Sequence, residues 1–239
     1  MRERYLNFIS KTRNIFSDFM KEGAFVAIDY VGRVKDTREI FDLTDEALAK
    51  KEGVFNEKTK YGPVKIAVGA GFVIRGLDAA LKDMKVGDKK VVDIEPANGF
   101  GERSPEMTRL IPISVFKQQD VEPNPGSYVT LNGITGRVAS QDGGRVKIDF
   151  NHPLAGKALE YEIQILEEII KLEEKILSVV TFLSRVEDGK FTVKVENNTA
   201  EITVGGVDIL HKVKEQVSES ILKWIPEITT VKFVDVFAK

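Results

Sequence analysis

The pattern of predicted strands and helices changes in the middle of the sequence and later returns to its first form. This interruption is the feature that most constrains the fold. Up to Phe100-Gly101 the chain mixes strand-like alternation with short helical segments. Between about Arg109 and Asp149 it is dominated by strands around the turn sequences Asn132-Gly133 and Asp142-Gly143-Gly144, which favour hairpins. Strand alternation then returns over Leu159–Leu166. We therefore expect a small all-β unit inserted into a larger domain.

Length and composition favour several small cores in a globular protein. The chain has 239 residues, of which 42% are hydrophobic and 30% are charged. Its 35 basic and 37 acidic side chains give a formal net charge of -2. Because so balanced a chain has no overall positive field, nucleic acid is not an expected partner.

Several classes of site are disfavoured by residue type. The chain has no cysteine, which excludes disulfides and thiolate chemistry, and its two histidines, His152 and His211, lie far apart, so no metal site is expected. No apolar run approaches the roughly 20 residues that span a bilayer. Charged residues interrupt the apolar residues near the N-terminus, whereas a signal peptide needs an uninterrupted apolar segment. A cytoplasmic protein without membrane contact is expected.

Residues 1–22 are predicted to form an amphipathic helical extension. Apolar side chains between Tyr5 and Met20 fall on one side of a helical wheel, and the helix should end near Glu22-Gly23. It would dock on the body of the protein or on a sister subunit. Alternatively, Met20 is the natural start and the helix is an optional extension.

The next segments predict strands and two short helices. Strands are expected over Ala24–Lys35, continued by Glu39–Asp42, and over Pro63–Val68 and Lys89–Ile94. Helices are expected over Asp45–Lys51, capped by Thr44, and over Phe72–Leu81, with Val73, Leu77, Ala80 and Leu81 as its buried stripe.

The last 70 or so residues predict a separate α-β-β-α-β unit. Its expected elements are a helix over Glu168–Arg185, a hairpin turning at Asn197-Asn198, a helix over Ile209–Trp224 and a strand over Val231–Phe237. Five apolar residues exceed what so small a unit easily buries: Trp224, Ile225, Val231, Phe233 and Phe237. A homodimer through this unit is therefore expected.

Five sequence blocks resemble the signatures of the FKBP-type peptidyl-prolyl isomerases, in the same order and spacing. They are Asp29-Tyr30-Val31-Gly32, Ile40-Phe41-Asp42, Gly71-Phe72-Val73-Ile74-Arg75-Gly76-Leu77, Met84-Lys85-Val86-Gly87-Asp88 and Phe100-Gly101. Two further segments, Ile111–Phe116 and Asn151–Gly156, resemble the entry and exit of the insert-in-flap domain of SlyD-like members. With its C-terminal extension, the chain is similar to the long archaeal members of this family.

The resemblance implies an α+β fold. It comprises an FKBP-like antiparallel sheet with one helix, a small all-β domain inserted in the flap, and a C-terminal two-layer α-β-β-α-β domain. The implied parts are the extension 1–22, the isomerase domain 23–108 and 150–166, the insert-in-flap chaperone domain 109–149, and the dimerisation domain 167–239.

The implied function is peptidyl-prolyl cis-trans isomerisation combined with chaperone binding of unfolded, proline-containing polypeptides. No cofactor is implied. The alternative is a non-catalytic holdase or assembly scaffold with a degenerate pocket. Leu77, where many relatives have tryptophan, and Phe100, where tyrosine is usual, support that alternative.

Position matching assigns the implied site. The pocket walls would be Tyr30, Phe41, Val64, Val73, Ile74, Leu77, Phe100 and Tyr161, with Leu77 as the floor. The Ile74 N–H would hold a substrate carbonyl, and Asp42 would either orient the peptide or bond to nearby backbone. Unfolded segments would bind Ile111, Val115 and Phe116, which otherwise belong to the core of the inserted unit.

Overall fold

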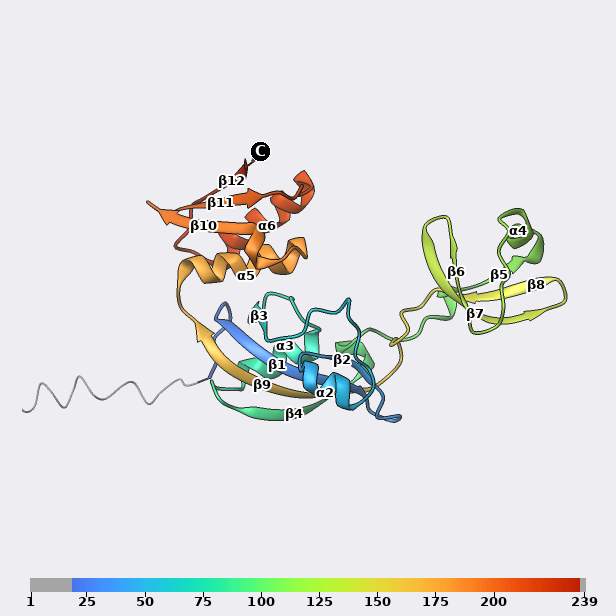
Figure 1. Ribbon diagram of the computed structural model, residues 1–239. Helices are drawn as coiled ribbons and strands as arrows, with labels where there is room; N and C mark the ends of the chain where they lie inside the picture. Colours follow the sequence, from blue (N-terminus) through green and yellow to red (C-terminus); the bar gives the residue numbers. More distant parts are fainter. Residues whose placement is uncertain (1–18, 237–239) are drawn as a thin grey trace, which may run out of the picture.

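A computed structural model describes residues 19–236, arranged as three sheets with helices (Figure 1). The predicted N-terminal helix lies outside the described residues except for its last turn. That turn is not helical, because Phe19 is in a bend and Glu22-Gly23 form a turn.

The central sheet has five strands and is entirely antiparallel. Four follow the order β2-β1-β9-β4, and β3 pairs with the start of β1. The strands are β1 (Phe25–Val34), β2 (Ile40–Leu43), β3 (Val64–Ala67), β4 (Lys89–Ile94) and β9 (Leu159–Ile169). Because β4 and β9 are neighbours, the chain between them leaves the sheet and returns to it.

The segment Glu39–Asp42 was expected to continue β1, and this is wrong. Its residues from Ile40 onward belong to β2, which runs back antiparallel to β1 with Val31 opposite Leu43. The chain reverses around Arg38, which adopts a left-handed conformation with φ of 61°. Alternation alone cannot distinguish a continued strand from a hairpin partner.

Two helices accompany this sheet, α2 (Glu46–Lys51) and α3 (Arg75–Lys82). The predicted cap at Thr44 is wrong: the Asp45 carboxylate accepts hydrogen bonds from the Ala47 and Leu48 N–H groups. Thr44 is buried instead, where its hydroxyl oxygen accepts from the Tyr30 N–H at 3.0 Å. Helix α3 begins three residues later than predicted, so residues 72–74 form the loop that leads into it.

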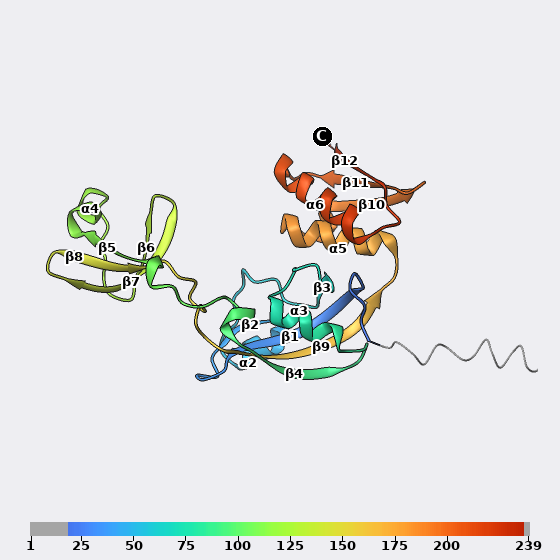
Figure 2. The same cartoon turned by 180° about the vertical axis from the view of Figure 1, so that it is seen from behind.

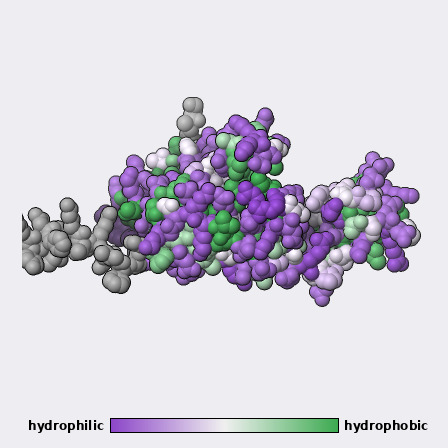
Figure 3. Space-filling view, turned by 90° about the horizontal axis from the view of Figure 1, so that it is seen from below, coloured by the Kyte–Doolittle hydropathy of each residue, from purple (hydrophilic) through white to green (hydrophobic). Residues whose placement is uncertain are grey.

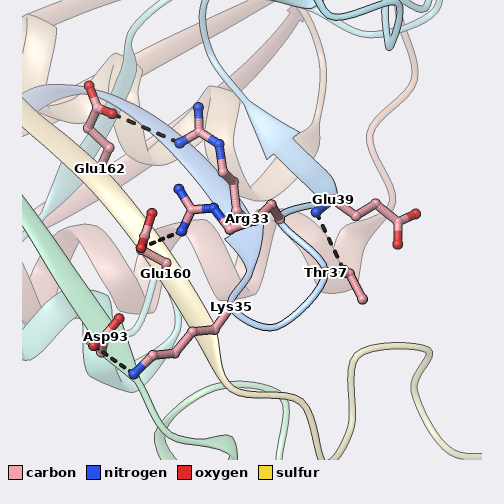
Figure 4. Close-up of polar contacts among 8 residues, drawn as sticks. Arg33, Lys35, Thr37, Glu39, Asp93, Glu160 and Glu162 are labelled. Carbon is pink, nitrogen blue, oxygen red and sulfur yellow. Dashed lines mark hydrogen bonds and ion pairs between the residues drawn. The ribbon is translucent and has the colours of Figure 1, made fainter.

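The two faces of the sheet differ in character. Its inner face packs on α3 through fully buried side chains that include Ile28, Ile66, Leu81, Ile163 and Ile165. Its outer face carries ion pairs, as Figure 4 shows for Arg33 with Glu162 and for Lys35 with Asp93, and Arg38 pairs with Glu160 on the same face. Exposed pairs of this kind contribute little, so the fold depends on the apolar face.

The inserted unit forms a four-stranded sheet in the order β5-β8-β7-β6. Its elements are β5 (Thr108–Pro112), α4 (Ile113–Gln118), β6 (Tyr128–Leu131), β7 (Ile134–Asp142) and β8 (Arg145–Asp149). Both predicted hairpins are confirmed, because Asn132-Gly133 and Gly143-Gly144 have the positive φ values that tight hairpin turns need. Strand β5 was not predicted. Figure 2 shows the unit standing away from the central sheet on two chain segments.

The C-terminal unit has the predicted α-β-β-α-β order. It consists of α5 (Leu172–Ser184), β10 (Phe191–Glu196), β11 (Thr199–Gly205), α6 (His211–Trp224) and β12 (Thr230–Val236). Its sheet order is β10-β11-β12, and β12 runs parallel to β11. The predicted start of α5 at Glu168 is wrong, because β9 continues to Ile169, which pairs with Phe25.

The C-terminal unit packs on the central sheet through α5, as Figure 1 shows. Phe25 and Ala67 of the central sheet belong to its hydrophobic core, and the rings of Phe72 and Phe182 stack at 4.5 Å. The C-terminal unit exposes less apolar surface than predicted, because Ile225 is fully buried and Phe233 is half-buried against this core.

The face of the molecule in Figure 3 is mostly hydrophilic, with small hydrophobic groups scattered over it. Within residues 19–236, no helix is both long and apolar enough to cross a membrane.

Candidate functional site

Four aromatic rings meet on the inner face of the central sheet. Tyr161 from β9 contacts Tyr30 from β1 with ring centroids 5.7 Å apart, and it meets Phe41 from β2 edge to face at 5.6 Å. Phe100, which follows β4, meets Phe41 edge to face at 6.1 Å. Such tilted and edge-to-face contacts are the favoured geometry for aromatic pairs, so the rings form an ordered wall.

Gly32 allows these rings to come together. A Cβ atom at this position would lie 2.8 Å from Phe41 Cζ and 3.1 Å from Tyr161 Cε1. Any side chain on β1 here would displace the two rings, which explains a glycine within a strand.

Aliphatic side chains complete the candidate pocket. Val64 comes from β3, Val73 and Ile74 from the loop before α3, and Leu77 from the first turn of α3. The structure brings all eight predicted pocket walls into one hydrophobic cluster. Leu77 is only 2% exposed, whereas Val73, Ile74 and Phe100 are half-buried.

The loop before α3 is held by a buried carboxylate that sequence reasoning missed. Asp78 is 8% exposed and accepts hydrogen bonds from the N–H groups of Gly69 at 2.6 Å and Gly71 at 3.1 Å. Among the described residues, no acceptor pairs with the Ile74 N–H. This donor is therefore available at the edge of the pocket.

Tyr30 and Asp42 form the polar edge. The Tyr30 hydroxyl donates to Asp42 Oδ2 at 2.9 Å. Burial is the main cause that raises the pKa of Tyr30 well above its usual range, and the charge of Asp42 is the second. The same two causes, in the same order, raise the pKa of Tyr161. Both phenols therefore stay neutral at physiological pH. The hydrogen bond recorded for Asp42 joins it to a pocket side chain rather than to nearby backbone.

His152 stabilises the turn that follows it, because its Nδ1 accepts a hydrogen bond from the Leu154 N–H at 3.2 Å. Its ring also stacks on Phe100, with centroids 4.3 Å apart and planes 2° apart. No sequence signal joins positions 100 and 152, because this contact arises where the chain returns from the inserted unit. His152 thus extends the aromatic wall.

A cleft of about 420 Å³ connects this wall with the inserted unit. Phe41 and His152 line it on the pocket side, and Tyr128 and Arg137 line it on the side of the inserted unit. Arg103 and Asp149, which form an ion pair, lie between them. The cleft therefore lies between the aromatic wall and the inserted unit.

A second groove, of about 320 Å³, lies on the inserted unit itself. Ile111 and Val115 line it as predicted, together with the apolar residues Met107, Leu131, Ile134 and Phe150. The predicted exposure of Phe116 is wrong. Its side chain is 0% exposed because this small sheet needs a large residue from α4 in its core.

Comparisons with known proteins agree with this geometry. The model of a family described as "FKBP26, IF domain" matches residues 109–154. A "Short-type peptidyl-prolyl cis-trans isomerase" of Methanocaldococcus jannaschii is 32% identical over 148 residues, which cover 62% of this chain and 93% of that protein.

Two bacterial relatives match shorter parts of the chain. A "Probable FKBP-type 16 kDa peptidyl-prolyl cis-trans isomerase" of Pseudomonas fluorescens is 38% identical over 110 residues, which cover 44% of this chain and 72% of the relative. An "FKBP-type peptidyl-prolyl cis-trans isomerase SlyD" of Haemophilus influenzae is 29% identical over 151 residues, with coverages of 62% and 71%. With these similarities and the pocket geometry together, the chain belongs to the FKBP-type peptidyl-prolyl cis-trans isomerase family.

Proposed function

We propose that the protein isomerises X-Pro bonds in the pocket around Leu77. The observation that carries this proposal is an apolar cluster walled by aromatic rings, with the unpaired Ile74 N–H at its edge. Rotation about an X-Pro bond has a barrier of about 20 kcal/mol. The twisted amide has lost resonance and is less polar than the planar one, so an apolar site favours it over the ground state.

Each group would have a distinct role in this reaction. The Ile74 N–H would donate to a substrate carbonyl, a hydrogen bond worth roughly 1 kcal/mol. Asp42 would orient the peptide or its carbonyl dipole while it holds the Tyr30 hydroxyl. The aromatic rings and Leu77 would enclose the proline ring.

Exchange spectroscopy by NMR on a short X-Pro peptide tests this proposal. We expect catalysed cis-trans exchange, and we expect Leu77→Asp to abolish it because a carboxylate would enter the apolar floor. A matched control is Leu210→Asp, at a side chain that is 72% exposed. Exchange at the uncatalysed rate with the unmodified protein would favour the alternative, a holdase or assembly scaffold with a degenerate pocket.

We further propose that residues 109–149 form an insert-in-flap chaperone domain that binds unfolded polypeptide. The apolar groove that contains Ile111 and Val115 supports this, as does the match of this region to the "FKBP26, IF domain" family. Weak binding there would raise the effective concentration of X-Pro bonds near the pocket.

Replacement of residues 109–149 by a short loop tests the chaperone role. Proline-limited refolding of a protein substrate should slow markedly, whereas exchange in a short peptide should be preserved. Equal acceleration of refolding with and without these residues would remove the chaperone role and leave the isomerase role intact.

The remaining proposals concern organisation. We assign residues 23–108 and 150–166 to the isomerase domain and 167–239 to a dimerisation domain, as in the long archaeal members, and we place the protein in the cytoplasm. Strand β12 supports a homodimer because it is an edge strand with Val234 and Val236 exposed. Residues 1–22 remain assigned as an N-terminal extension, of which residues 19–22 are not helical.

A further inference from the structure

A crevice of about 630 Å³ separates the loop before β3 from the end of α5, two elements that lie side by side in Figure 1. Its charged lining contains four cations and two carboxylates: Lys58, Lys60, Lys65, Arg185, Glu187 and Asp188. The crevice is therefore positively charged, although the whole chain has a formal net charge of -2.

The four cations and two carboxylates give the crevice lining a formal charge of +2. Lys60 pairs with Asp188 at 3.5 Å. Over residues 19–236, neither Lys58, Lys65 nor Arg185 forms an ion pair with a carboxylate. Three cations can therefore attract an anionic group.

The crevice borders the hydrophobic cluster that forms the candidate proline pocket. Val64 lines the crevice and also belongs to the pocket cluster. Phe182 of α5 lines the crevice, packs on the same cluster and stacks on Phe72, which directly precedes Val73. A peptide whose proline occupies the pocket would therefore have a neighbouring part of its chain within reach of the crevice.

We propose that this crevice binds an acidic stretch that flanks the proline of a polypeptide substrate. The proposal rests on the proposed isomerase function and names the substrate class that the site prefers. Aspartate or glutamate side chains within a few residues of the proline pair with Lys58, Lys65 and Arg185. Tyr61 and Phe182 provide apolar contacts for the same stretch.

The test uses labelled peptides that share one X-Pro core and carry three glutamates, three serines or three lysines on one side of it. Separate sets place the extension before and after the proline. Affinity is measured by fluorescence anisotropy with the full chain, and turnover is measured by NMR exchange. For one of the two placements, the glutamate peptide should bind roughly threefold to tenfold more tightly than the serine peptide, and the lysine peptide should bind more weakly than the serine peptide. High salt should reduce these differences in affinity.

Charge reversal of the crevice provides the decisive comparison. Lys58→Glu combined with Lys65→Glu should abolish the preference for glutamate and leave the serine peptide unaffected. The control is Lys90→Glu with Lys212→Glu, an equal charge change at two exposed lysines outside the crevice lining. The proposal would be overturned if the glutamate and serine peptides bound with equal affinity wherever the extension is placed. It would also be overturned if the preference for glutamate survived charge reversal of the crevice. Preferential binding without exchange in any peptide would reject the isomerase function and retain this site.

Discussion

At the scale of single residues, the candidate pocket depends on positions where the addition or loss of one atom affects the aromatic rings. Gly32 is the clearest case, because the rings of Phe41 and Tyr161 occupy the space of its missing side chain. Phe100 is a second, because it lacks the hydroxyl of the usual tyrosine while its ring stacks on His152. We therefore expect substitutions at these two positions to change ligand binding and turnover.

Gly32→Ala should destabilise the protein by roughly 1–3 kcal/mol and reduce X-Pro exchange, because the new methyl group displaces the two rings. Thermal unfolding and peptide exchange measure the two effects. Gly189→Ala is the matched control, since no atom lies within 4 Å of its added Cβ. A Gly32→Ala protein with unchanged stability and exchange would show that the rings are not confined as described.

Phe100→Tyr should increase turnover and strengthen the binding of macrolide inhibitors, because it restores an oriented donor at the pocket. One hydrogen bond of about 1 kcal/mol corresponds to roughly fivefold in affinity. Inhibitor titration and peptide exchange check this, with Phe100→Leu as a variant that adds no donor. If neither quantity changes, the missing hydroxyl does not limit this pocket.

Tyr30→Phe should reduce the loss of stability at alkaline pH. Since the folded-state pKa of Tyr30 is raised, its stabilising contribution is fully present below the unfolded-state pKa of about 10 and is lost as pH rises above it. Urea unfolding between pH 8 and 11 measures the slope. Tyr128→Phe, at an exposed tyrosine of the inserted unit, is the control. A slope identical to that of the unmodified protein would contradict the buried, neutral phenol.

At the scale of elements, α5 connects the C-terminal unit with the pocket loop. The stacked rings of Phe72 and Phe182 join the two cores, and the Asp78 carboxylate holds the same loop from α3. The conformation of Val73 and Ile74 is thus supported from both sides. The C-terminal unit therefore contributes to pocket geometry as well as to its own core.

Phe182→Ala should lower kcat for peptide exchange severalfold at temperatures where the protein remains folded, because residues 72–74 lose one support. Circular dichroism confirms the folded state, and Phe182→Tyr should restore exchange by keeping the stack. Leu222→Ala, at a 43% exposed side chain of α6, should leave exchange unchanged. Normal exchange in folded Phe182→Ala would show that α5 does not support the loop.

At the scale of the whole molecule, the apolar groove and the candidate pocket lie on different units. The inserted unit carries the apolar groove, the central sheet carries the pocket, and a cleft lies between them. The C-terminal unit places its helices toward the central sheet, as Figure 1 shows, and leaves β12 as an edge strand. An edge strand presents unpaired backbone groups that a second copy can pair with.

Light scattering at micromolar concentration should give the mass of a dimer. Val234→Lys should shift the equilibrium toward the monomer, because a lysine on the β12 edge opposes pairing with a second copy. Thr192→Lys, on the opposite edge strand β10, is the matched control. A monomeric unmodified protein would reject the homodimer and leave the isomerase function untouched.

The sequence alone was sufficient for features that depend on local patterns. Turn pairs such as Asn132-Gly133 and Asn197-Asn198 predicted their hairpins, because few residues tolerate positive φ. The resemblance of the family blocks predicted that Tyr30, Phe41 and Leu77 lie together, and they belong to one hydrophobic cluster.

The tertiary structure decided the features that depend on contacts between distant segments. Burial of Phe116, the stacking of His152 on Phe100 and the extension of β9 to Ile169 all result from partners far away in the chain. The charged crevice joins residues 58–65 to residues 181–188, which no local pattern relates. Periodicity reports which face of an element is apolar, whereas packing of that element determines what the face contacts.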